Sequence, residues 1–276
     1  MRRALLLSLM YLIGGGTAEA QDIPTGDIRP IEMQSTDVFE VLAQLRRAQS
    51  AFARRDYLSA RRGFESVLMH DPNLESAQSG LRRTLIALRE FNEAELLMSD
   101  KTSPDSVIIQ VKLGQVDNPE TLISETIKQN SDPRLWTHLG QLQDKDRKFL
   151  LARQSYAMAN LAGARPGLSE NNIGQSHWLA GEHELALEAF TKATVLDPED
   201  IQFDNNRRRA LIRLGHTHDA IAGLDANRAG LFLAQAADKA VLENETKLAK
   251  FLYRKSLNIA PRHNPRIAEK LARLEQ

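Results

Sequence analysis

The chain has 276 residues, with 36 Lys and Arg against 36 Asp and Glu, so its formal net charge is zero and no overall positive field draws it to nucleic acid or acidic lipid. Hydrophobic residues make up 42% of the sequence and charged residues 26%, which is typical of a packed core and excludes a disordered or collagen-like chain. Cysteine is absent, which excludes disulfides, thiolate metal sites, and catalytic or lipid-modified cysteines.

The first 20 residues have the pattern of a secretory signal peptide. Arg2 and Arg3 precede an apolar run over residues 4–13, and the segment ends in Ala18-Glu19-Ala20. About ten apolar residues cannot cross about 30 Å of hydrocarbon, although an uncleaved membrane anchor is the alternative. We therefore expect cleavage after Ala20, a periplasmic or secreted protein, and no stable membrane insertion after cleavage.

Residues 21–36 are predicted to form an extended leader, because they contain Pro24, Gly26 and Pro30 without an apolar period. The chain beyond the leader repeats itself. Prolines at positions 72, 104, 133, 166 and 198 are separated by 32, 29, 33 and 32 residues, and the next, at 261, follows after 63. A period in the low thirties indicates stacked helix pairs.

The two clearest copies of the repeat begin at Pro133 and Gly167 and align without gaps at an offset of 34. Small and large residues recur at the same places, with Trp136, Leu139, Gly140, Ala152, Tyr156 and Ala159 in the first copy and Glu170, Ile173, Gly174, Ala186, Phe190 and Ala193 in the second. Small residues let two helices approach closely, and the aromatic residue fills the space beside them.

This spacing resembles the tetratricopeptide repeat (TPR). The resemblance implies an all-α fold, a right-handed α-solenoid of about seven helix hairpins with a concave groove and a C-terminal capping helix. The solenoid is expected over residues 37–276, with units near 41–74, 75–102, 103–132, 133–166, 167–200, 201–229 and 230–263 and the cap at 264–276.

Three Xaa-Pro pairs predict helix starts, because an N-cap residue followed by Pro begins a helix favourably. They are Ser103-Pro104 and Asn118-Pro119 in the third unit and Asn264-Pro265 before the cap. The sixth unit departs from the repeat, since Arg207 and Arg208 stand where a leucine and a small residue are expected.

The sequence contains no pattern that requires catalysis or a cofactor. No phosphate-binding loop and no Gly-x-Ser-x-Gly motif occurs. His216 and His218, beside Asp219, have a spacing that suits an exposed metal site, but their place at a predicted turn favours solvated side chains. We therefore expect no enzyme, no cofactor and no metal, and retain a metal-binding protein or enzyme as the remote alternative.

In proteins of the TPR fold, the first helix of each pair lines the groove. The resemblance thus implies that the fifth and sixth units carry a polar strip that binds a protein or peptide segment, made of Asn171, Asn172, Gln175, Trp178, Asn205, Asn206, Arg209 and Arg213. Amides can bond a peptide backbone, and arginine can hold a carboxylate.

Each element of this strip also has a purely structural interpretation. Trp178 packs between hairpins in that case, Asn206 is a buried amide, and the arginine run 207–209 pairs with Asp200 and Asp204 on a solvated face. The sequence leaves both interpretations open.

Residues 167–276 are also similar to the TPR protein of tight-adherence (Flp) pilus assembly, although those proteins commonly carry an N-terminal Cys and apolar residues in place of Arg207 and Arg208. The predicted function is that of an exported, non-catalytic scaffold that binds protein segments during assembly of an envelope structure, a Flp-type pilus or a secretion machine, without nucleic acid as a partner. A soluble adaptor of polysaccharide export is the alternative.

Overall fold

The structure, a computed structural model, describes residues 35–98, 100–259 and 264–276. The predicted signal peptide, residues 1–20, lies outside this part of the chain, as do the leader up to residue 34 and Pro261. Helix α1 begins at Ser35, so the last two residues expected in the leader are helical.

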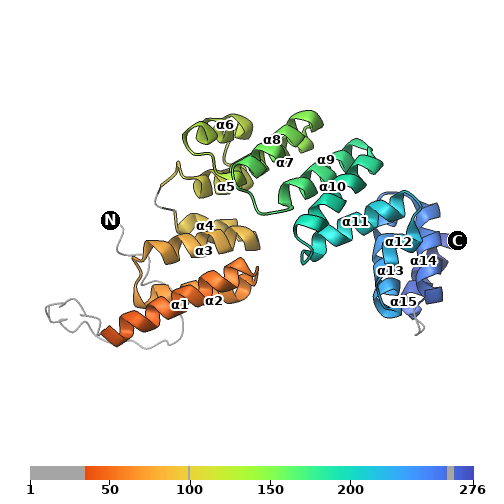
Figure 1. The fold of residues 1–276 in the computed structure, drawn as a ribbon, viewed down its shortest axis with the longest axis horizontal. Coiled ribbons are helices and arrows are strands. Elements are labelled where there is room, and N and C mark those ends of the chain that lie inside the picture. The colour runs from red at the N-terminus through yellow and green to blue at the C-terminus, as the bar shows by residue number, and fades with distance from the viewer. Residues whose placement is uncertain (1–34, 99, 260–263) are drawn as a thin grey trace, which may run out of the picture.

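Fifteen helices form in the described residues, and they pack as seven consecutive pairs followed by a single helix (Figure 1). The pairs are α1 (Ser35–Ala53) with α2 (Tyr57–His70), α3 (Glu75–Leu88) with α4 (Phe91–Leu96), α5 (Pro104–Lys112) with α6 (Pro119–Gln129), α7 (Pro133–Lys145) with α8 (Phe149–Leu161), α9 (Leu168–Ala180) with α10 (His183–Leu196), α11 (Ile201–Arg213) with α12 (Thr217–Ile221), and α13 (Ala226–Leu242) with α14 (Thr246–Ile259); α15 (Pro265–Glu275) follows. The expected all-α array of helix hairpins is confirmed.

The helices of the fourth and fifth pairs approach closely at glycine. A methyl group added at Gly140 would lie 2.5 Å from the ring of Tyr156, and one added at Gly174 would lie 2.6 Å from the ring of Phe190. Both aromatic rings are almost completely buried. The repeated small and aromatic residues therefore set the distance between the two helices in the fourth and fifth pairs.

A buried carboxylate joins the fourth and fifth pairs. Asp144, on α7, accepts hydrogen bonds from the hydroxyl groups of Tyr156 at 2.8 Å and Ser176 at 2.6 Å. Because Ser176 belongs to α9, this interaction crosses from one pair to the next. Burial and the neighbouring Asp144 charge raise the pKa of Tyr156 well above its ordinary value, so the phenol stays a donor.

The sixth pair is irregular because a large side chain occupies the position of the small residue. Arg208 is buried, and its Nη1 donates to the carbonyl oxygens of Ala220 at 2.7 Å and Ala222 at 3.0 Å. These carbonyl groups lie at the end of α12, which has only five residues. The guanidinium thus supplies hydrogen bonds to the terminal carbonyl groups of α12, a helix that stops after little more than one turn.

Two of the three predicted caps form as expected. The side chains of Ser103 and Asn264 accept hydrogen bonds from backbone N–H groups in the first turns of α5 and α15. Helix α6 begins at Pro119 as predicted, but the Asn118 side chain makes no capping hydrogen bond.

The seventh pair begins earlier than the sequence pattern indicated. Helix α13 starts at Ala226, inside the expected sixth unit, because the Asp225 side chain accepts a hydrogen bond from the N–H of Arg228 and caps the helix there. At the end of the array, α15 packs its apolar residues on the cluster formed by α13 and α14. No helix in the described ranges is both long and apolar enough for a membrane span.

Replacing Ala186 by leucine is expected to destabilise the fold by about 1–3 kcal/mol, because Ala186 is fully buried beside Phe190 and the added carbons overpack the helix pair. Denaturant unfolding of the purified chain measures this loss. The matched control is Glu188→Leu on the same helix, which removes only an exposed ion pair with Lys192 and is expected to cost at most about 0.5 kcal/mol. Equal losses in the two variants would contradict the packing described.

Candidate functional site

The eight residues predicted to bind a partner lie on two first helices of neighbouring pairs. Four lie on α9 and four on α11, and the side chains of all eight are half-buried: Asn171, Asn172, Gln175, Trp178, Asn205, Asn206, Arg209 and Arg213. Within the described part of the chain, the side chains of Asn172, Gln175 and Asn205 form no hydrogen bond to another residue.

Two of the predicted amides bond each other. The Asn206 Nδ2 donates to the Asn171 Oδ1 at 2.8 Å, from α11 to α9. The structural interpretation of Asn206 is thus partly correct: the side chain is satisfied by a neighbouring unit, although it is half-buried and not fully enclosed.

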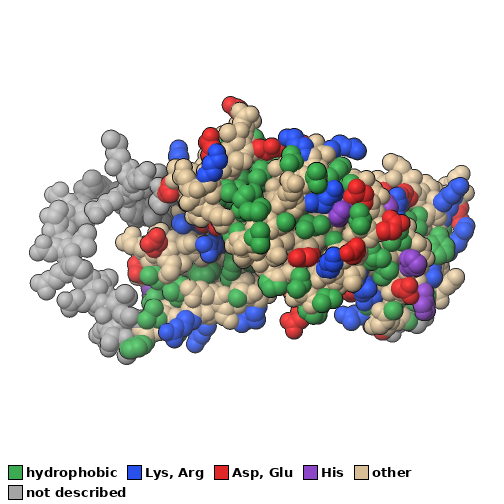
Figure 2. All heavy atoms as spheres, turned by 45° about the horizontal axis from the view of Figure 1, so that its top comes forward, with side chains coloured by type: hydrophobic (Ala, Val, Ile, Leu, Met, Phe, Trp, Pro, Cys, Tyr) green, Lys and Arg blue, Asp and Glu red, His purple; other side chains and the backbone are tan. Residues whose placement is uncertain are grey.

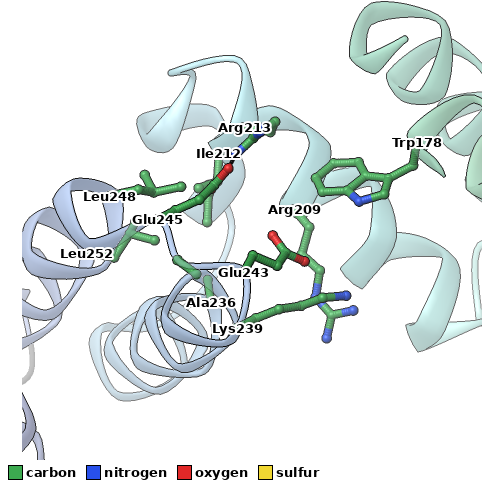
Figure 3. A pocket seen from close by; sticks show the side chains of 11 residues that line it. Trp178, Arg209, Ile212, Arg213, Ala236, Lys239, Glu243, Glu245, Leu248 and Leu252 are labelled. Carbon is green, nitrogen blue, oxygen red and sulfur yellow. Dashed lines mark ion pairs between the residues drawn. The ribbon is translucent and has the colours of Figure 1, made fainter. Parts of the chain in front are cut away.

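Three other predicted residues line a pocket between the fifth, sixth and seventh pairs (Figure 3). Trp178 comes from α9, and Arg209 and Arg213 come from α11. The remaining walls are Ile212, Ala236, Lys239, Ala240, Glu243, Glu245, Leu248 and Leu252. The pocket therefore combines an indole ring, an apolar wall and charged groups of both signs.

Arg213 is held in place by two neighbours. It forms an ion pair with Glu245, and its Nε donates to the Nε2 of His183 at 3.2 Å. Burial and the positive charge of Arg213 lower the pKa of His183. His183 is thus kept as the neutral acceptor that the hydrogen bond from Arg213 requires.

Arg209 and Lys239 are the cations of the pocket without a carboxylate partner. Within the described residues, neither of these two side chains forms an ion pair. The pocket has two acidic residues: Glu245 is paired with Arg213, whereas Glu243 forms no ion pair in the described residues. In Figure 3, the Arg209 side chain runs downward and the Lys239 side chain runs to the right, and the ends of both lie in the same part of the view. Two unpaired cations and one unpaired carboxylate leave the pocket with a net positive charge.

Trp178 both packs between helix pairs and lines the pocket. Its ring lies 4.9 Å from the His183 ring, centroid to centroid, with a tilt of 56°, and it packs on the buried cluster of Ala186, Phe190 and Ala210. The indole also lines the pocket, so packing fixes an aromatic surface that a ligand can contact.

The arginine run 207–209 divides into two groups. Arg207 and Arg208 form the expected ion pairs with Asp204, on the same helix, but Arg208 is buried and does not lie on a solvated face. The expected pairing with Asp200 is wrong, because that carboxylate binds Arg55 and Arg165. Arg209 lies apart from both pairs and lines the pocket.

The contribution of the seventh pair to this site, above all Lys239 and Glu243, was not predicted from the sequence. The available signal was a polar face on α13, the first helix of the pair that follows α9–α10 and α11–α12. The assumed unit boundary did not reveal this face, because α13 begins earlier and has 17 residues, so its side chains are shifted in register relative to those of α9 and α11.

The histidines considered for metal binding lie in the turn before and at the start of α12. His216 and His218 are exposed, and the His216 Nδ1 is 3.9 Å from the Asp219 carboxylate. Nowhere in the described ranges do three His, Asp or Glu side chains gather in a metal-binding arrangement.

On the face shown in Figure 2, acidic and basic side chains are interspersed.

Replacing Arg213 by methionine is expected to raise the pKa of His183 toward its ordinary value, because the positive charge is removed while burial remains. An NMR titration of the imidazole signals measures this shift. Since the unfolded chain binds the proton more readily, His183 also makes the fold less stable as the pH falls below about 6.5. The control is Arg228→Met, an exposed arginine paired only with Asp225. An unchanged His183 pKa in the Arg213 variant would contradict the contact.

No protein-family model matches the chain, and no curated protein does either. Among solved structures, a human IFIT1 dimer with m7Gppp-AAAA is 15% identical with a TM-score of 0.55, over 79% of this chain and 59% of that one. A tetratricopeptide repeat protein from Parabacteroides merdae is 12% identical with a TM-score of 0.44, over 86% and 100%. The C-terminal part of a TPR repeat-containing protein from Cytophaga hutchinsonii is 16% identical with a TM-score of 0.44, over 82% and 99%.

Likeness at this level of identity concerns the fold alone, and it gives no assignment to pilus assembly. It agrees with the helix pairs that follow one another in the described residues and with the repeated glycine and aromatic positions. The chain therefore has an all-α fold of sequentially packed helix pairs, a TPR-like repeat array.

Proposed function

We propose that this protein is an exported, non-catalytic scaffold that binds a protein segment during assembly of an envelope structure, such as a Flp-type pilus or a secretion machine. The signal-peptide pattern of residues 1–20 supports export. A TPR-like array supports protein binding, since stacked repeats present an extended surface. The weak sequence similarity of residues 167–276 to the pilus-assembly protein supports the envelope role.

The pocket of Trp178, Arg209 and Lys239 is the single observation that carries the binding site. Its unpaired cations suit a carboxylate, and its apolar wall, which includes Ile212 and Leu248, suits an aliphatic or aromatic side chain. The favoured partner is thus a protein segment in which an acidic group lies next to an apolar residue.

Nearby amides suit the backbone of such a segment. Asn172, Gln175 and Asn205 lie on the same helices as Trp178 and Arg209, and their side chains form no hydrogen bond within the described part of the chain. Each amide offers both a donor and an acceptor. A segment that places one side chain in the pocket can therefore continue along α9 and α11.

The proposal is tested by capture of partners from the native envelope after light cross-linking, with the mature chain from Gln21 to Gln276 as bait. Pilus or secretion proteins are expected with the parent chain. An Asn205→Ala, Arg209→Glu variant is expected to lose them by at least about tenfold, because reversing a charge that contacts a partner costs about 2 kcal/mol or more.

The control variant is Arg228→Glu, which reverses a charge on an exposed arginine at the start of α13. It is expected to recover the same proteins as the parent. Equal recovery by the Arg209 variant would place binding elsewhere on the array, and recovery of no envelope protein by the parent would overturn the scaffold function.

A further inference from the structure

Four charged side chains form a compact network at one place in the array. Arg55 donates from Nη1 to Asp200 at 2.6 Å and from Nη2 to Asp197 at 2.9 Å. Arg165 donates to the same two carboxylates, at 2.5 Å to Asp197 and 2.9 Å to Asp200. Each guanidinium therefore bridges both carboxylates, and each carboxylate accepts from both arginines.

These residues come from units that are distant in the sequence. Arg55 lies in the turn between α1 and α2, whereas Asp197 and Asp200 lie between α10 and α11, 142 and 145 residues further on. All other side-chain hydrogen bonds and ion pairs of the described residues join positions at most 35 apart. In Figure 1 the curved path of the first five pairs brings these two connections to the same place.

The acceptor side of the network forms without Arg55. Arg165, in the connection between α8 and α9, lies over the ring of the buried Phe203, 4.8 Å from its centroid. It bonds both carboxylates without any contribution from the first pair. The Asp200 side chain is 2% exposed and also accepts from the N–H of Gln202. Burial opposes its ionisation, but hydrogen bonds from Arg55, Gln202 and Arg165 outweigh burial and lower its pKa.

The consequence is that Arg55 adds a link without being needed to satisfy a buried charge. Loss of Arg55 leaves Asp200 with Arg165 and Gln202, so it should not cause the large destabilisation that follows from an unpaired buried carboxylate. What is lost is the connection between the first unit and the start of α11.

Such a connection has a large effect on shape in a repeat array. Each unit contacts mainly its neighbours, so small changes at successive interfaces accumulate along the stack. We propose that Arg55, Arg165, Asp197 and Asp200 form a latch that holds the first five units in a closed arch, and that release of Arg55 opens the arch. In this proposal the latch controls access to the face that the arch encloses. The proposal does not depend on the identity of any partner.

Distance measurement between two spin labels tests the latch directly. Because the chain has no native cysteine, Ala53→Cys and Glu199→Cys provide two unique and exposed labelling sites on either side of the network. Double electron–electron resonance is expected to give a short, narrow distance distribution in this labelled chain. Adding Arg55→Glu is expected to lengthen and broaden it, with a melting temperature close to that of the labelled parent.

The matched control is Arg147→Glu. Arg147 occupies the corresponding turn between α7 and α8 with the same left-handed backbone conformation, at φ 60° against 62° for Arg55, but it has no ion-pair partner in the described part of the chain. Its distance distribution is expected to remain that of the labelled parent.

A charge exchange then separates ion pairing from a general disturbance of the turn. Combining Arg55→Glu with Asp197→Arg restores opposite charges between positions 55 and 197 and is expected to give a shorter distance than Arg55→Glu alone. The latch is overturned if Arg55→Glu leaves the distance unchanged, if the labelled parent already has a long distance, or if the exchange gives no shorter distance than Arg55→Glu alone.

Discussion

The contact between an aromatic ring and a glycine inside a helix pair is the constraint on which the array depends. At Gly140 and Gly174 the ring of the second helix occupies the space that a Cβ atom would need. The two helices can therefore approach until the ring rests on the backbone, and no closer. Because the same arrangement recurs 34 residues later, the fourth and fifth pairs have similar dimensions and can stack. The position of α9 against α10 rests on this spacing.

Buried polar groups determine how neighbouring helices meet, both between pairs and within a pair. The hydroxyl of Ser176 reaches the carboxylate of Asp144 in the preceding pair, and Ser256 donates to the carbonyl of Gly230 inside the seventh pair. A displaced register would leave these buried groups without partners, which costs more than the bonds contribute. Apolar packing thus sets the distance between helices, while hydrogen bonds select their relative positions.

The irregular sixth unit is where the array gains its distinctive chemistry. Arg208 replaces a small residue and supports the short α12, after which α13 begins early. The adjoining region contains both the pocket around Trp178 and, at the start of α11, the carboxylate of Asp200 that joins the first unit. The unit that departs from the repeat pattern therefore lies beside the pocket and the long-range ion pair. Functional sites are where a sequence is expected to depart from local structural rules.

The sequence by itself determined the all-α repeat, the recurring glycine and aromatic contacts, two helix caps and the face that carries Trp178 and Arg209, because these depend on residue type and short-range spacing. Only the tertiary structure decided that Asn171 and Asn206 bond each other, that Lys239 joins the pocket, and that Arg55 meets Asp200. These contacts depend on the accumulated curvature of several units and on helix lengths that depart from the repeat, and neither quantity is encoded in a local pattern.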